Sequence, residues 1–297
     1  MATSMPDPAE NPFDLAHPEQ SLEEALDATV RCARRIPFYG GALPDVEVRE
    51  VKDFTGGVPF TSRVDLSMAD GLAELITDPR LVFRGLYPFH QNVCTFPFQV
   101  VAGEKDLLQR HERMCAILEA VGFAEAAETL VLTSPPQFFF ASDLCAEIFF
   151  EGHHCSIQDV SELSPSAIRD RIEAFGAELI VLATDSVALP PEAFPDRVRG
   201  LITFRGGYAE LARALDVTAV DIYTLTEAPY LGHRMAGERH YRYNGEHFFI
   251  ERSPAGNVTI TSLLWEVMPL IRYQTYDRCG EVRDDEGLVE VTAFGEW

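Results

Sequence analysis

The sequence lacks the features that mark membrane and secreted proteins. No run approaches the roughly eighteen apolar residues that a membrane-spanning helix needs. Residues 1–14 are acidic and proline-rich and contain no apolar segment of the signal-peptide type. The 6 cysteines form no Cys-x-x-Cys pair and no dense framework, which predicts reduced thiols within a core. We therefore expect a soluble protein of the cytoplasm.

Positive charge is also scarce. The chain has 24 lysines and arginines against 47 acidic residues, a net charge of −23. This balance argues against a surface for nucleic acid or for an anionic membrane. A hydrophobic fraction of 46% is sufficient for a real core and excludes wholesale disorder.

Hydrophobic periodicity alternates between helix and strand along most of the chain. Amphipathic helices are predicted at residues 22–36, 104–121, 165–175 and 208–215. Ser21 and Glu24 predict a capping box for the first of them, and Ser164 is the expected N-cap of the third. Apolar runs predict strands at 129–133, 178–183, 200–204 and 219–223. This alternation predicts an α/β fold with a parallel or mixed sheet flanked by helices.

The pattern changes after Glu227. Residues 240–251 predict a β-hairpin that turns on Asn244 and Gly245, and residues 258–263 predict another strand. We therefore expect a small antiparallel β portion near the C-terminus. The expected organisation is a flexible arm at 1–20 and one core domain at 21–297, with an α/β part at about 21–228 and a β-rich part at about 229–297.

Residues 262–277, SLLWEVMPLIRYQTYD, form the most informative segment. Taken alone, they predict a buried strand and a turn. The run closely resembles a segment of the phenylacetate–CoA ligase branch of adenylate-forming enzymes, the ANL superfamily. The resemblance implies that Asp277 binds the ribose hydroxyls of ATP or AMP and that Arg272 lies near a phosphate or carboxylate. Tyr276 replaces the family's usual glycine.

Residues 221–227 resemble the same family's "Ile-Tyr-Gly-x-Thr-Glu" motif. The resemblance implies that Tyr223 lies near adenine, that Thr226 meets the phosphate and that Glu227 ligates magnesium, with Thr224 in place of a glycine. Hard oxygen ligands after a parallel strand suit Mg²⁺. The alternative is an ordinary strand exit with a surface glutamate.

Two further segments match the family less specifically. Gly206 and Gly207 fall where the family has a strand–helix turn beside adenine and substrate, although such turns are common punctuation. An aromatic loop that lines the acyl pocket corresponds to Phe138, Phe139 and Phe140, with Tyr208 and Tyr230. These side chains would suit a small aromatic or apolar acid, and the alternative is that they are simply core.

Other parts of the family pattern are missing. The family's phosphate loop is rich in glycine and ends in lysine, whereas the corresponding residues 93–100 contain neither. Pro97 has no N–H group, so this segment is a poor phosphate cradle. The chain ends at Trp297, where family members continue into a C-terminal domain with a catalytic lysine. We therefore expect a truncated relative with a degenerate phosphate loop.

Histidines offer one alternative that we favour less. Across the expected hairpin, His240 and His247 would lie diagonally on one face, and with His233 they could bind zinc. Solvent-facing or substrate-contacting histidines are the better expectation, so zinc is not expected here. His153 to Cys155 predict a strand start.

Three functions fit these observations. The first is AMP-forming activation of a small aromatic or apolar carboxylic acid in specialised metabolism, with Mg²⁺ and ATP or AMP as cofactors. The second is an enzyme that reuses the pocket without ATP, for transfer, condensation or cyclisation of an activated substrate. The third is a non-catalytic partner subunit. The expected partner is a small acyl substrate, together with a carrier protein, CoA or a second protein chain. The sequence leaves the oligomeric state open.

Overall fold

The computed structural model describes residues 20–82, 84–86, 100–184, 189–206, 208–263 and 265–295. Its helices are α1 Leu22–Ala33, α2 Pro37–Gly40, α3 Val51–Gly57, α4 Arg63–Ser67, α5 Leu72–Leu75, α6 Glu104–Ala120, α7 Phe138–Phe150, α8 Pro165–Phe175 and α9 Ala209–Leu215. Its first strands are β1 Arg84–Leu86, β2 Val100–Ala102, β3 Glu128–Thr133, β4 His154–Asp159, β5 Leu179–Ala183, β6 Gly200–Phe204 and β7 Thr218–Tyr223. The others are β8 Gly232–Met235, β9 His240–Tyr243, β10 Phe248–Arg252, β11 Asn257–Ser262, β12 Tyr273–Arg283 and β13 Leu288–Ala293.

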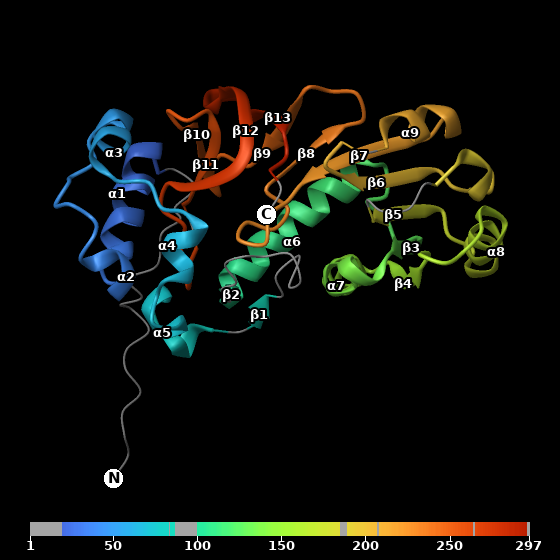
Figure 1. Cartoon of the computed structure of the whole chain (residues 1–297), viewed down its shortest axis with the longest axis horizontal. Coiled ribbons are helices and arrows are strands. Elements are labelled where there is room, and N and C mark those ends of the chain that lie inside the picture. Colours follow the sequence, from blue (N-terminus) through green and yellow to red (C-terminus); the bar gives the residue numbers. More distant parts are fainter. Residues whose placement is uncertain are drawn as a thin grey trace, which may run out of the picture.

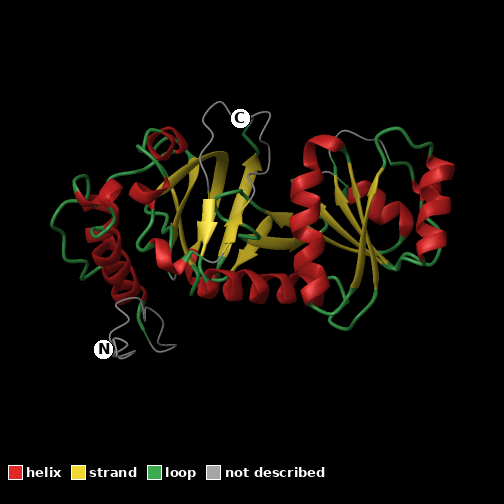
Figure 2. Cartoon of the chain, turned by 90° about the horizontal axis from the view of Figure 1, so that it is seen from below, coloured by secondary structure: helices red, strands yellow, loops and turns green. Residues whose placement is uncertain are grey.

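One eleven-stranded sheet runs through the molecule in the order β10-β11-β12-β13-β9-β8-β7-β6-β5-β3-β4. In this order, every neighbouring pair between β4 and β7 is parallel. Every neighbouring pair between β7 and β10 is antiparallel. Helices flank both ends of this sheet (Figures 1 and 2). The prediction of an α/β fold with an added antiparallel portion is therefore confirmed, and the two portions form one continuous sheet.

Local sequence explains the predicted helices. In α1, Ser21 Oγ accepts from the Glu24 N–H at 3.3 Å and Glu24 returns a carboxylate to the Ser21 N–H at 3.0 Å, which is the predicted capping box. Helix α8 starts at the predicted Ser164 cap and ends at Gly176, whose φ of 83° suits glycine. The strand β5 is buried along its whole length, as expected for a strand covered on both faces.

The predicted hairpin at 240–251 is wrong. Strands β9 and β10 do not pair with each other, because β9 pairs with β8 and β13 while β10 pairs with β11. The turn itself exists: the N–H groups of His247 and Phe248 both donate to the Asn244 carbonyl at 3.1 Å. Its geometry sends the chain to the far edge of the sheet instead of back along β9.

The N-terminal helices pack at the β10–β11 end of the sheet, shown in blue in Figure 1. Their buried side chains, including Leu26, Tyr39 and Phe54, share one apolar cluster with Phe249 and Ile271 of the C-terminal part. The first and last parts of the chain are therefore joined by a core. No helix within the described residues is long and apolar enough to cross a bilayer. The predicted arm at 1–20 lies outside this part of the chain except for residue 20.

Candidate functional site

Glu227 follows β7 and is 1% exposed. Its Oε1 accepts from Arg63 Nη1 at 2.8 Å and from the Tyr273 hydroxyl at 2.9 Å. Its Oε2 is buried and has no hydrogen-bond partner within the described residues. Burial raises the pKa of Glu227, and the charge of Arg63 opposes that rise. The site therefore contains a buried acid with one unsatisfied oxygen.

Asp277 lies on β12 and is 2% exposed. Its Oδ2 accepts from the Tyr223 hydroxyl at 2.7 Å, and its Oδ1 accepts from the Gly295 N–H at 2.8 Å. Burial raises the pKa of Asp277, and these two hydrogen bonds oppose the rise. The negative charge of Asp277 in turn raises the pKa of Glu227. The structure thus brings together three residues that the two sequence motifs predicted separately: Tyr223, Glu227 and Asp277.

The segment after β13 covers Asp277. The Phe294 ring lies 6.1 Å from the Tyr223 ring, and the Arg205 guanidinium lies 5.9 Å from the Phe294 ring. A Cβ added at Gly295 would lie 2.5 Å from the Tyr276 Cβ and 2.8 Å from the Tyr276 carbonyl oxygen, so only glycine allows this approach. Sequence analysis missed this segment, because neither residue belongs to a recognised motif.

Gly206 has a clear structural role. Its φ is 74°, and its N–H donates to Asp221 Oδ1 at 2.8 Å. A Cβ there would lie 2.8 Å from Arg234 Nη2. Gly206 therefore lets the turn after β6 close over Asp221, and its predicted contact with a nucleotide stays a prediction. Gly207 lies outside the described residues.

The structure gives Arg272 partners within the protein, and its predicted place near a phosphate or carboxylate ligand stays a prediction. Its guanidinium is buried and donates to both Glu251 carboxylate oxygens and to the carbonyls of Thr55 and Val58. It also lies 3.9 Å from the Phe60 ring centroid. These contacts use the N–H groups that a phosphate would need, and they fix the N-terminal helices to the sheet.

The predicted aromatic lining is divided between core and surface. Phe140 is buried and packs against Phe204, with ring centroids 4.9 Å apart, whereas Phe138 and Phe139 are 46% and 52% exposed. The Tyr208 hydroxyl donates to the Thr184 carbonyl at 2.8 Å. The core alternative therefore holds for Phe140, and pocket lining by the others stays a prediction. Thr226 is buried beside Glu227, and its contact with a phosphate stays a prediction.

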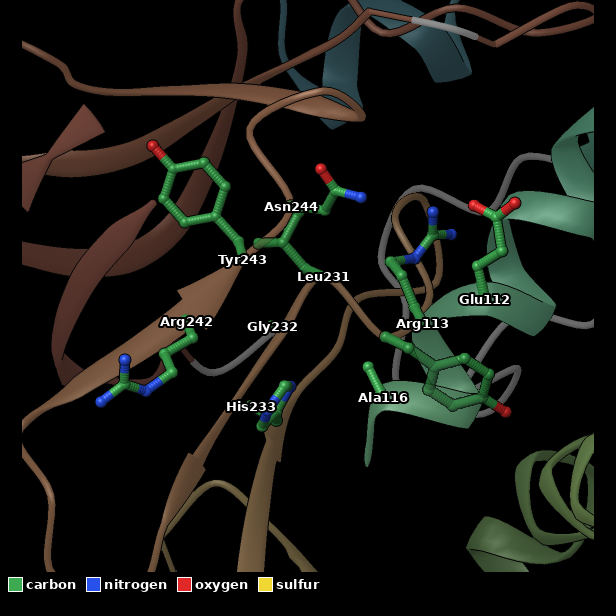
Figure 3. A pocket seen from close by; sticks show the side chains of 10 residues that line it. Glu112, Arg113, Ala116, Leu231, Gly232, His233, Arg242, Tyr243 and Asn244 are labelled. Atoms are coloured by element: carbon green, nitrogen blue, oxygen red, sulfur yellow. The ribbon is translucent and has the colours of Figure 1, made fainter. Parts of the chain in front are cut away.

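The predicted diagonal pair of His240 and His247 does not exist, because the hairpin that would place it does not form. His240 Nε2 lies 3.2 Å from Glu281, and His247 contacts Arg113 on α6. His233 instead lines a cavity of about 230 Å³ between α6 and the strands β8 and β9, together with Arg113 and Asn244 (Figure 3). The predicted phosphate loop lies outside the described residues apart from Val100.

No family model matches the sequence, and no curated protein matches it. Solved structures do match the fold. An open conformation of 2-hydroxyisobutyryl-CoA ligase in complex with 2-HIB-AMP and CoA is similar at 12% identity and a TM-score of 0.69, over 90% of this chain and 71% of that chain. The same ligase in the postadenylation state with R3-HIB-AMP gives 11% identity and a TM-score of 0.68, over 92% of this chain and 66% of that chain.

A third match is that ligase with 2-HIB-AMP and CoA in the thioesterification state. It has 12% identity and a TM-score of 0.65, over 99% of this chain and 72% of that chain. These matches show that the fold is similar to that of this CoA ligase. Shared fold alone does not assign an activity.

Proposed function

We propose that this protein binds the adenylate part of an activated small carboxylic acid and acts in AMP-forming acid activation of the acid–thiol ligase type. One observation carries this proposal: Asp277 and Glu227, both buried, meet at the carboxyl end of β7 with Tyr223. The carboxyl ends of parallel strands are the usual ligand sites of open α/β sheets. The similar solved structures contain acyl-AMP compounds.

The hydrogen bonds of Asp277 support a ribose site. Both of its oxygens accept from neutral donors, one hydroxyl and one N–H. Two ribose hydroxyls would offer the same kind of donor and would form charge-assisted hydrogen bonds. The Gly295 N–H already donates to Oδ1, and the segment that carries it covers the carboxylate that a ribose would approach. Binding of AMP is therefore in competition with the covering segment Phe294–Gly295.

Glu227 is the residue that would hold Mg²⁺. Its buried Oε2 lacks a hydrogen-bond partner within the described residues, and a hard cation bound by one carboxylate and by substrate phosphates is typical Mg²⁺ chemistry. When bound, Mg²⁺ would neutralise phosphate charge. Arg63 already supplies one positive charge to Oε1 at 2.8 Å, so this chain would bring both a carboxylate and a guanidinium to the phosphate side of the site.

The acid would be small and aromatic or apolar, in a pocket near Phe138, Phe139 and Tyr208. The acceptor thiol would come from CoA or a carrier protein, and a second protein chain would be the source of any missing catalytic group. A second candidate is a binding subunit or an enzyme that works without ATP. It is favoured by the hydrogen bonds that Tyr223 and Gly295 already make to the two oxygens of Asp277.

Calorimetry with AMP and with ATP–Mg²⁺ tests the proposal. We expect AMP to bind at least as well as ATP, and Asp277→Asn to weaken AMP binding by about tenfold or more, because charge-assisted hydrogen bonds are lost. Asp284→Asn is the matched control, since Asp284 also accepts from a tyrosine hydroxyl, Tyr243, at 2.7 Å. Nucleotide binding that ignores Asp277→Asn would overturn the proposal, and no binding of either nucleotide would favour the second candidate.

A further inference from the structure

Three side chains with metal-binding atoms meet between α6 and α7, outside the site described above. His111 and Cys115 lie on α6, and Glu151 directly follows α7 (α6 and α7 are labelled in Figure 1). One ligand atom from each, His111 Nδ1, Cys115 Sγ and a Glu151 oxygen, lies within 4.8 Å of the other two. None of these residues belongs to the motifs that the sequence analysis used.

The same carboxylate faces both helical side chains. His111 Nδ1 lies 2.5 Å from Glu151 Oε1, and Cys115 Sγ lies 2.8 Å from Glu151 Oε2. Residues four apart on a helix project from the same face, so His111 and Cys115 form one wall and Glu151 the other. Cys115 donates to Glu151 Oε2, whereas Oε1 has no hydrogen-bond partner within the described residues although His111 lies beside it. A divalent ion that replaced the thiol proton would meet all three donors without a change of helix register.

The two walls are rigid. Beside the cluster α6 buries Met114, Ile117 and Leu118, which restricts rotation of the helix. After Glu151 the chain turns at Gly152, whose φ is 88° and whose N–H donates to the Phe149 carbonyl at 3.0 Å. Metal sites are most selective when their ligands stand on fixed elements.

The turn is also held from the other side. Both ring nitrogens of His153 are engaged, with Thr129 Oγ1 at 3.1 Å and the Phe123 carbonyl at 3.2 Å. His153 is therefore not a fourth ligand. It anchors the turn that positions Glu151, in the way that outer groups orient the ligands of known metal sites.

We propose that His111, Cys115 and Glu151 form a site for one divalent transition-metal ion of the Zn²⁺ class, with a fourth coordination position open to solvent. Imidazole, thiolate and carboxylate together are ligands of Zn²⁺, whereas Mg²⁺ and Ca²⁺ prefer oxygen alone. The His111 side chain is 41% exposed and the Glu151 side chain 11% exposed, so an ion has a path from solvent.

Binding has a defined proton balance. Partial burial and the hydrogen bond to Glu151 raise the pKa of Cys115 to about 11, so its thiol carries a proton at neutral pH. The sulfur–hydrogen bond breaks and its proton leaves to solvent as the sulfur–metal bond forms, while neutral His111 would bind through Nδ1 with its ring proton on Nε2. No oxidant or reductant is involved. The expectation against zinc at His233, His240 and His247 is not affected, because this site uses other residues.

Titration of the reduced full chain with Co²⁺ tests the proposal. We expect 1:1 binding with a near-ultraviolet thiolate-to-cobalt charge-transfer band, displaced by Zn²⁺. Cys115→Ser should abolish the band, and His111→Gln and Glu151→Gln should each weaken binding by about tenfold or more. Cys145→Ser is the control, because Cys145 is half-buried outside the cluster, and should keep the band.

A band that persists in Cys115→Ser, or no Co²⁺ binding by the folded wild-type chain, would overturn the site. Circular dichroism of each variant confirms folding, and the two other substitutions still report on the site if Cys115→Ser fails to fold. None of these outcomes depends on nucleotide binding at Asp277, so the two proposals are tested separately.

Discussion

His247 illustrates how a single buried residue makes stability depend on pH. It is 3% exposed, and its Nδ1 lies 3.3 Å from Arg113 Nη1 while its Nε2 lies 3.3 Å from Glu112 Oε2. A neutral ring satisfies both contacts, because Nδ1 accepts from Arg113 and Nε2 donates to Glu112. Burial, and next the charge of Arg113, lower the pKa of His247 to about 4. The opposing Glu112 carboxylate is largely exposed and therefore weaker.

We predict that this residue costs the folded state stability in mild acid. As pH falls below about 6.5, the unfolded chain binds a proton that folded His247 does not bind, so the free energy of unfolding decreases until pH approaches the folded pKa. From about pH 7.5 to about pH 5 the loss should be roughly 2 kcal/mol. Urea unfolding at a series of pH values measures it.

His247→Gln is the comparison, since glutamine does not titrate. Its free energy of unfolding should fall less over the same pH range, and the difference between the two curves isolates the histidine. Parallel curves for the wild-type chain and this variant would contradict the prediction.

At the scale of elements, the sequence predicted the features that depend on contacts within one helical turn. The ends of α1 and α8 follow from Ser21, Ser164 and Gly176, each of which acts within its own turn. The failed hairpin depended on pairing between elements. An Asn-Gly turn favours a reversal, but β10 pairs with β11, and its Phe248 and Phe249 rings pack against Trp265 and Phe54. A turn does not encode these distant contacts.

Arg272 also has partners that its motif does not show. The carbonyl oxygens that it binds belong to Thr55 and Val58, more than two hundred positions earlier, and its carboxylate partner is Glu251. A motif contains none of these partners. An arginine suggested a bound anion, and the anion that Arg272 contacts in the structure is the carboxylate of Glu251.

We predict that Arg272→Met destabilises the protein by about 3–5 kcal/mol, because it leaves Glu251 buried without its counter-charge. Chemical denaturation measures the change. The double variant Arg272→Met, Glu251→Met should recover part of the loss, since it removes both charges. Arg169→Met is the control: Arg169 pairs with Glu173 at the surface, where such a pair contributes less than about 1 kcal/mol. Equal losses in the two arginine variants would contradict the assigned role.

At the scale of the whole molecule, the two sequence motifs supplied residues that the structure brings together, but not the segment that covers them. Sequence analysis predicted Tyr223, Glu227 and Asp277 as site residues because each belongs to a sequence motif that resembles one of a known family. Phe294 and Gly295 reach Asp277 only because β13 pairs with the β12 strand that carries it, as Ala293 opposite Arg278 shows. Such neighbours are products of sheet register, which the order of residues in one motif does not specify.

We predict that Gly295→Ala increases AMP affinity. The added Cβ collides with the backbone of Tyr276, so the segment lifts and the Gly295 N–H leaves Asp277. Removing one competing hydrogen bond of about 1 kcal/mol corresponds to roughly fivefold tighter binding. Gly41→Ala is the control, because an added Cβ there meets no atom within 4 Å. Unchanged or weaker AMP binding by Gly295→Ala, with Asp277→Asn still defective, would show that the segment does not compete.

The pair of Arg63 and Glu227 has a consequence for motion. Arg63 stands at the start of α4, 164 positions before its partner, so the buried acid keeps its counter-charge only while the N-terminal helices stay docked. Partial undocking would strand Glu227 without a cation, and the site and the docking interface therefore open and close as one cooperative unit. A cation that ligates Glu227 weakens the ion pair between Glu227 and Arg63, and therefore weakens the docking of α4. By thermodynamic reciprocity, undocking of α4 increases the affinity of Glu227 for that cation. Amide hydrogen exchange in α4 would thus report on whether Glu227 has bound a cation.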